Sequence, residues 1–139
     1  MNVFLKSITI CVVFVLLSFY SHAQHKVVIQ LNTADTAAWS STIGNIKNLQ
    51  KIWPNNIQVE VVVHGKALDF LVAKKTHLLA DIEGLVNTGV QFNACENSMR
   101  KHNILKEELI KVAGTVPSGV AEVILKQESG WSYLKAGVN

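Results

Sequence analysis

The sequence predicts one small α/β domain that contains a mostly parallel sheet with helices on both of its faces. Apolar runs typical of buried strands alternate with amphipathic patterns typical of helices from residue 26 to residue 134. Repeated strand–helix–strand units of this kind favour parallel strands joined by helical crossovers. No internal repeat, proline-rich linker or low-complexity run divides the chain. A domain of this size buries about two-thirds of its unfolded surface, so it needs no disulfide bonds.

The first 23 residues have the pattern of a secretory signal peptide that is removed from the mature protein. Lys6 precedes an apolar run at residues 7–20, and the small residues Ser21 and Ala23 stand three and one before an expected cut. Cleavage after Ala23 removes 23 of the 139 residues and leaves a domain of 116 residues, 24–139. The alternative is an uncleaved membrane anchor, but the apolar run is shorter than the roughly 20 residues that a spanning helix needs. The sequence therefore predicts an exported protein, periplasmic or secreted, with no stable membrane span after cleavage.

The net charge and the cysteine content limit the classes of partner and of chemistry that the chain can have. The formal charge of +3 falls to +2 without Lys6, which is too small to indicate a nucleic-acid partner. The two cysteines are Cys11, inside the predicted signal peptide, and Cys95. Exported proteins usually pair their cysteines, and the mature chain offers Cys95 no partner. Cys95 is therefore buried and inert, paired between molecules, or a reactive thiol.

The first half of the domain is expected to contain two strands and three helices. Residues 26–31 form an apolar run, as expected of a strand covered on both faces. A helix opened by Asp35 and stopped by Pro54 follows, and its apolar side chains fall near one face: Trp39, Ile43, Ile46, Leu49 and Trp53. Residues 57–63 form the second strand. Two short helices are expected after it, the first marked by Ala67, Leu68, Leu71 and Val72 and the second by Leu78, Leu79, Ile82, Leu85 and Val86.

The second half of the domain repeats the pattern. Residues 89–95 are the third expected strand, and residues 96–101 are the first turn of a helix. A further helical segment is then indicated by three apolar positions, Leu105, Leu109 and Val112. The last long helix is expected to start within residues 116–119 and to close at Gly130, before a final strand at residues 131–134.

Cys95 is the leading candidate for chemistry because it ends the third strand where the next helix begins. There it faces the unpaired N–H groups of that helix, whose partial positive charge favours thiolate over thiol. With Arg100 and Lys101 nearby, such a site can lower a thiol pKa from about 8.5 into the range of roughly 3.5–7.5. Glu96 and burial act in the opposite direction. The alternative is that Cys95 is a small buried hydrophobe, since free cysteine is among the most buried residue types.

Other candidates lie at the same edge, because the carboxyl ends of parallel strands gather on one side of a sheet. His64 follows the second strand, and it is expected either to accept the proton of Cys95 or to bond loop backbone only. Asn32 after the first strand, Gly65 and Asn97 are candidates for ligand binding. No histidine spacing makes a metal site with Cys95, and no glycine-rich phosphate loop is present, so neither a metal nor a cofactor is expected.

Three segments of the chain resemble the DsrE/DsrF-like proteins. Residues 90–101, which hold Cys95, resemble the cysteine segment of that family, and residues 62–68 resemble a segment upstream of it. The third match begins at residues 116–122 and continues to Lys135. The resemblance covers nearly all of the mature chain, and it implies a small Rossmann-like domain that commonly assembles into homo-oligomers, either trimers or hexamers. In the sulfur-relay branch, a cysteine at this position carries sulfane sulfur as a persulfide, and the resemblance implies that role for Cys95.

Two hypotheses of function follow. The first is an exported sulfur carrier or sulfurtransferase in which Cys95 accepts sulfane sulfur from a donor and passes it to an acceptor protein. Arg100 or Lys101 and the helix terminus would stabilise the anionic sulfur of Cys95, and no organic cofactor is required. The second is a non-enzymatic, oligomeric binding module in which Cys95 is structural. An accessible thiol with a lowered pKa favours the first hypothesis, and an unreactive thiol favours the second.

Overall fold

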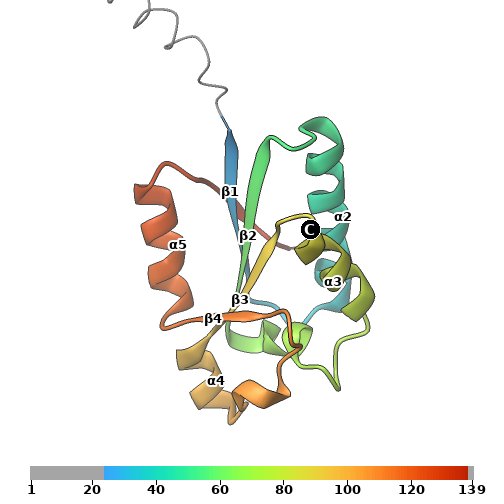
Figure 1. Ribbon diagram of the computed structural model, residues 1–139. Helices are drawn as coiled ribbons and strands as arrows, with labels where there is room; N and C mark the ends of the chain where they lie inside the picture. The colour runs from blue at the N-terminus through green and yellow to red at the C-terminus, as the bar shows by residue number, and fades with distance from the viewer. Residues whose placement is uncertain (1–23, 138–139) are drawn as a thin grey trace, which may run out of the picture.

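Five parallel strands form the sheet of the computed structural model, which describes residues 24–137 (Figure 1). Their order across the sheet is β4-β3-β2-β1-β5, and every neighbouring pair runs parallel, as the sequence predicts. The strands are β1 His25–Leu31, β2 Ile57–Val63, β3 Gln91–Cys95, β4 Gly114–Val116 and β5 Ser132–Lys135. The predicted signal peptide lies outside the described residues. Within residues 24–137, no helix is both long and apolar enough to cross a membrane.

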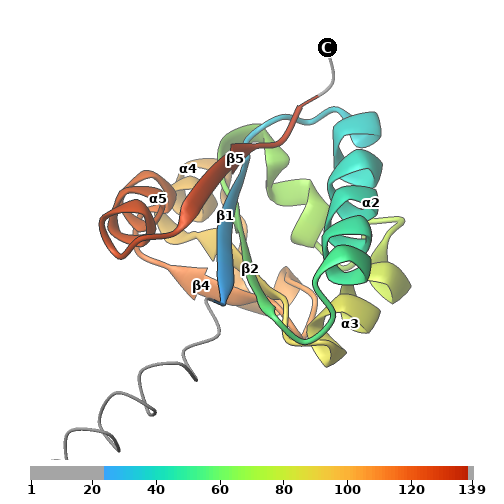
Figure 2. The ribbon, with the colours of Figure 1, turned by 90° about the horizontal axis from the view of Figure 1, so that it is seen from above.

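The helices cover the two faces of the sheet unequally (Figure 1 and Figure 2). Two of them, α2 (Thr36–Ile52) and α3 (Leu79–Asn87), pack on one face. The opposite face is covered by α5 (Gly119–Glu128). The short helix α4 (Glu96–His102) lies at the carboxyl end of the strands. Two 3-10 helices complete the described elements: η1 Gly65–Leu71 and η2 Lys106–Glu108.

The direction of the crossovers explains this distribution of helices. The chain moves one neighbour at a time from β1 to β4, and it then crosses back over the sheet to place β5 on the free side of β1. Right-handed crossovers in a constant direction put their helices on one face, and a reversal puts the next helix on the opposite face. Because α5 follows the reversal, it lies apart from the other helices, and its first turn returns to the carboxyl ends of the central strands.

The first helix shows how local sequence fixes an element. Asp35 is the N-cap of α2, and its carboxylate accepts a 2.8 Å hydrogen bond from the Ala37 N–H. The apolar positions that recur every three or four residues face the sheet, and the buried members are Ala38, Trp39, Thr42, Ile43 and Ile46. The helix ends at Ile52, and its C-cap residue Trp53 directly precedes Pro54, the residue that the sequence predicts to stop it.

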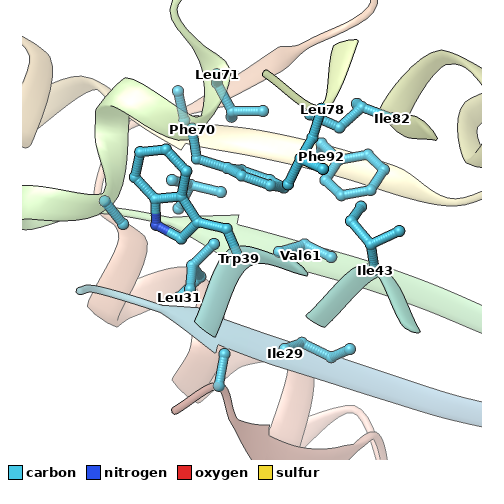
Figure 3. Close-up of a cluster of buried hydrophobic side chains, with 14 of the residues drawn as sticks. Ile29, Leu31, Trp39, Ile43, Val61, Phe70, Leu71, Leu78, Ile82 and Phe92 are labelled. Carbon is cyan, nitrogen blue, oxygen red and sulfur yellow. The ribbon is translucent and has the colours of Figure 1, made fainter. Parts of the chain in front are cut away.

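The main hydrophobic core lies between the sheet and the α2–α3 layer (Figure 3). Trp39 is central to it: its ring packs edge-on against Phe70 with centroids 5.7 Å apart, and its indole N–H donates to the Thr33 carbonyl at 2.8 Å. The α5 face holds a much smaller apolar cluster, which consists of Val28, Val62, Val116 and Val123 with Trp131 packed against them. Strand alternation also places polar side chains on this second face, among them the buried Glu60.

Two sequence predictions about the segment between α4 and α5 are wrong. The apolar positions at residues 105–112 were expected to form a helical segment, but they form only η2 and an extended stretch. That stretch is fixed by long-range pairing, because the Ile110 N–H donates to the Leu71 carbonyl and Leu109 forms a bridge with Val72. The sequence analysis also missed β4 and expected the last helix up to three residues too early. A three-residue edge strand is too short to show a strand period.

We predict that Gly114→Ala destabilises the fold by about 1–3 kcal/mol, the usual cost of leaving a buried polar group without its partner. A Cβ at residue 114 would lie 2.2 Å from the Asn93 side-chain oxygen. The Asn93 amide must then move, and it loses its 2.8 Å hydrogen bond to the buried Glu60 carboxylate. Urea denaturation measures the change. Gly84→Ala in α3 is the control, because a Cβ there meets nothing within 4 Å and alanine favours a helix. Equal stability of Gly114→Ala and the wild type would contradict the prediction.

Candidate thiol site at the carboxyl edge of the sheet

Cys95 lies where the sequence analysis expected it, at the junction of a strand and a helix. It is the last residue of β3 and the N-cap residue of α4. The residue is 4% exposed, so it lies just below the surface at the carboxyl edge of the sheet. Among residues 24–137 it is the free cysteine, and this part of the chain contains no second cysteine that could pair with it.

Four hydrogen-bond donors surround the sulfur of Cys95. Burial raises the pKa of the Cys95 thiol, but hydrogen bonds from the Ser98 hydroxyl and from the N–H groups of Gly119, Ser98 and Asn97 outweigh it, and the pKa lies below its ordinary value. The Cys95 side chain makes no regular capping hydrogen bond to α4, so these donors lie near the sulfur without an ideal capping geometry. The donors therefore favour the thiolate selectively.

Ser98 owes its orientation to Gly65. The Gly65 N–H donates to the Ser98 hydroxyl oxygen at 2.9 Å, which leaves the hydroxyl proton free to point at the sulfur of Cys95. Gly65 has a φ of +59°, in the left-handed region that disfavours residues with a side chain. Gly65 is predicted to bind ligand, and in the structure its N–H supports Ser98 while the residue also lines a hollow at this edge.

Gly119 brings the start of α5 into contact with the site. A Cβ on Gly119 would lie 3.1 Å from the His64 Cβ and 3.2 Å from the Cys95 Cβ, closer than ordinary side-chain contacts. The absence of a side chain therefore lets the first N–H of α5 reach the sulfur. Two helix N-termini, those of α4 and α5, converge on one thiol, and both favour its anion.

His64 is a neighbour of Cys95, but its ring is committed to another interaction. Its Nε2 lies 2.8 Å from the Gln30 side-chain nitrogen, and the Gln30 oxygen in turn accepts a hydrogen bond from the Tyr133 hydroxyl. This amide orientation makes Nε2 an acceptor, which requires a neutral ring. Burial lowers the pKa of His64 in the same sense. The donor to the sulfur is Ser98, whereas the sequence analysis considered His64 for the partner of Cys95.

The remaining sequence candidates have different surroundings. The Arg100 guanidinium donates to the Asn97 side-chain oxygen, so it binds its own helix and is not among the groups that lower the thiol pKa. Asn97 contributes its backbone N–H to the sulfur. Asn32 is exposed in the loop after β1. The Glu96 carboxylate accepts a 2.8 Å hydrogen bond from the Thr115 hydroxyl of β4.

Ser98 and Gly119 are the two site residues that sequence reasoning missed. A local signal existed for Ser98, because a serine three residues after an N-cap residue can reach back to it. Gly119 gave no such signal, since its contact with Cys95 depends on the pairing of β4 with β3, in which Val116 lies opposite Cys95.

A hollow of about 300 Å³ lies beside the site at the same edge. Gly65 lines it together with Lys66, His102 and the Lys75–Asp69 ion pair. A larger hollow of about 400 Å³ lies near the amino ends of β1 and β2, away from Cys95. The residues between 24 and 137 include no group of three or more histidine, cysteine, aspartate or glutamate side chains that could hold a metal ion.

The fold and the site define a small, doubly wound α/β domain with one thiol held at two helix N-termini. The chain belongs to the DsrE/DsrF-like family, which matches residues 12–136 and confirms the resemblance seen in the sequence.

Solved structures show the same fold. The protein of unknown function MTH1491 from Methanobacterium thermoautotrophicum is 26% identical with a TM-score of 0.77, and the match covers 81% of this chain and 99% of that one. The ychN protein from E. coli is 16% identical with a TM-score of 0.64, and the match covers 81% of this chain and 99% of the ychN chain. The conserved protein of unknown function BT1422 from Bacteroides thetaiotaomicron is 15% identical with a TM-score of 0.64, and the coverage is 79% and 93%. No curated protein matches this chain.

We predict that the alkylation of Cys95 by iodoacetamide has a midpoint below the free-cysteine pKa of about 8.5 and that Ser98→Ala moves this midpoint upward. A hydrogen bond to a charged group contributes about 1.5 kcal/mol or more, so alkylation of the variant near pH 6.5 should be roughly tenfold slower. Ser129→Ala is the control, because the Ser129 hydroxyl bonds the Leu125 carbonyl at the far end of α5. An unchanged midpoint in Ser98→Ala would show that Ser98 does not stabilise the thiolate.

Proposed function

We propose that this protein is an exported sulfur carrier in which Cys95 forms a persulfide. The observation that carries the proposal is the set of four donors around the sulfur, which lowers the thiol pKa in a family associated with sulfur relay. A buried cysteine that served only for packing would need no such donors, because the neutral thiol is already satisfied in an apolar site.

Loading of the carrier is a displacement at sulfur. The Cys95 thiolate attacks the outer, sulfane sulfur of thiosulfate, a new S–S bond forms, and the S–S bond of the donor breaks to release sulfite. The products are the anionic persulfide of Cys95 and sulfite, and no electron donor is consumed. The donors that stabilise the thiolate are placed to stabilise the persulfide anion as well.

The release of sulfur from the persulfide also favours a Cys95 thiol with a low pKa. An acceptor thiolate attacks the outer sulfur of the persulfide, and the Cys95 thiolate leaves. A leaving thiol departs faster when its pKa is lower, and the Cys95 pKa is lowered. The mature chain contains no second cysteine that could release the sulfur as an internal disulfide. The acceptor must therefore be a separate thiol, such as a cysteine of a partner protein.

The small exposure of Cys95 restricts the donor. With 4% of the residue exposed, a compact anion reaches the sulfur more readily than a bulky disulfide. The hollow beside Gly65 carries Lys66 and His102 next to the Lys75–Asp69 ion pair, and this net positive lining favours an anionic donor. The same low exposure also favours the second hypothesis, a binding module in which Cys95 is structural.

The experiment that separates the two functions is an intact-mass measurement after incubation with thiosulfate. We expect one added sulfur atom on the wild-type protein, lost after reduction, because the thiolate is the attacking species. Cys95→Ser should gain no sulfur, since it lacks the nucleophile. If the wild type gains no sulfur and its alkylation midpoint lies at or above about 8.5, the carrier function is wrong and the binding module takes its place.

Export is the second part of the proposal, and it rests on residues 1–23. Expression of the full chain in a bacterial host should yield a mature protein that begins at Gln24 and is found in the periplasm or the medium. Ala23→Leu is the matched variant, because a large residue before the cut blocks cleavage. Recovery of the wild type from the membrane fraction with Met1 at its start would contradict export.

We also propose that the domain is a homo-oligomer, a trimer or a hexamer. Apolar side chains are exposed on α5 and on the edge strand β5 beside it, including Ile124 at 49% and Leu134 at 40%. Light scattering at micromolar concentration should give the mass of three or six chains. Ile124→Glu should reduce the mass, because it places a charge on this surface, whereas Ile52→Glu at the end of α2 should not. A wild-type monomer would rule the assembly out.

A further inference from the structure

The attachment of α5 to the sheet depends on few contacts. Only two of its ten residues, Gly119 and Val123, are buried. Lys126 follows three residues after Val123, so the three residues share one face of the helix, at the spacing i, i+4 and i+7. A helix that covers a sheet usually has an apolar residue at such a position. Here the position is held by a lysine.

The partner of Lys126 is a carboxylate under the helix. Glu60 on β2 is 1% exposed, and its Oε2 lies 2.5 Å from the Lys126 ammonium. Its Oε1 accepts a 2.8 Å hydrogen bond from Asn93. The Oε2 has no regular hydrogen bond among the described residues, so the ammonium is what compensates its charge.

Lys126 is itself held in place by its surroundings. Its ammonium lies 4.4 Å from the centre of the Trp131 ring and 3.6 Å from the Glu122 carboxylate. The side chain is 23% exposed, so the ion pair with Glu60 is largely withdrawn from water and poorly screened by salt. The last turn of α5 is therefore fixed to β2, one helix length from the first turn, where Gly119 contacts Cys95.

We propose that Glu60 is a positioning residue for the thiol site: by binding Lys126 it fixes the helix whose other end presents the Gly119 N–H to Cys95. The inference rests on the proposed thiolate role of Cys95. Glu60 does not touch the sulfur, and it acts through the placement of α5. On this face of α5, Gly119 and Lys126 each fix one end of the helix to the sheet, and Val123 makes an apolar contact between them. Loss of either end contact lets the helix tilt relative to the sheet.

The other titratable side chains described around Cys95 do not bind Glu60: the Glu96 carboxylate binds Thr115, the Arg100 guanidinium binds Asn97, and the neutral His64 ring binds Gln30. Loss of the negative charge of Glu60 would by itself lower the thiol pKa. An upward shift of the thiol pKa would therefore report a longer distance between the Gly119 N–H and the sulfur.

The test is the pH dependence of iodoacetamide alkylation in Glu60→Gln, without any sulfur donor. Glutamine keeps the shape of the side chain and an oxygen for Asn93, but it removes the charge that holds Lys126. We expect the midpoint to move upward and the rate near pH 6.5 to fall about threefold, the effect of weakening one helix terminus at an anion. The double variant Glu60→Gln/Lys126→Met should show the same upward shift of the midpoint. It removes both charges of the ion pair, so it can replace the single variant if the unpaired Lys126 charge makes that variant fold poorly.

The control removes another ion pair. Asp81→Asn breaks the 2.5 Å pair with Lys47 on the opposite side of the molecule, and it should leave the midpoint unchanged. If Glu60→Gln and the double variant lose stability while the midpoint stays at the wild-type value, Glu60 is only structural and the inference is wrong. An equal shift in Asp81→Asn would overturn it too. Failure of the wild type to take up sulfur would instead refute the carrier function and leave this comparison of midpoints intact.

Discussion

The reversal of the chain after β4 is the constraint on which the site depends. The first four strands are added in one direction, and the connection to β5 returns over the opposite face. Because β4 pairs with β3, the first turn of α5 starts at the carboxyl edge, where α4 also begins, and the return lays the rest of α5 over the opposite face. The N–H groups of both helices meet at Cys95, which would otherwise face a single helix terminus. A position of this kind is where open α/β sheets generally bind ligands.

The two faces of the sheet serve different purposes. The α2–α3 face buries the large apolar side chains and supplies most of the hydrophobic stabilisation (Figure 3). The α5 face has a small apolar cluster and a row of polar side chains that includes Gln30, Glu60, His64 and Asn93. Polar groups under a helix must be paired, and here each is bound to another side chain. The stability of the domain therefore comes from one face and the chemistry of its edge from the other.

The thiol combines low exposure with a stabilised anion. Desolvation alone would keep Cys95 protonated, and the hydrogen-bond donors reverse that preference. Because the donors are backbone N–H groups and a serine fixed by Gly65, they are held by the fold and need no flexible cation. Stabilisation by fixed dipoles costs little reorganisation when charge moves on or off the sulfur. This suits a sulfur that alternates between thiolate, persulfide and leaving group.

The sequence by itself determined the central strands, the amphipathic helix α2 with its Asp35 cap, and the place of Cys95 at the end of β3, because apolar runs, caps and turns act over a few neighbouring residues. It did not determine β4, which is too short to show a period and exists only by pairing with β3. It named Arg100 and His64 as groups that act on the thiol, and in the structure the donors that lower the thiol pKa are Ser98, Gly119 and Asn97. Only the tertiary structure could decide this, because Gly119 comes close to Cys95 through the pairing of β4 with β3, which places Val116 opposite Cys95, and a glycine in the sequence does not show what it approaches.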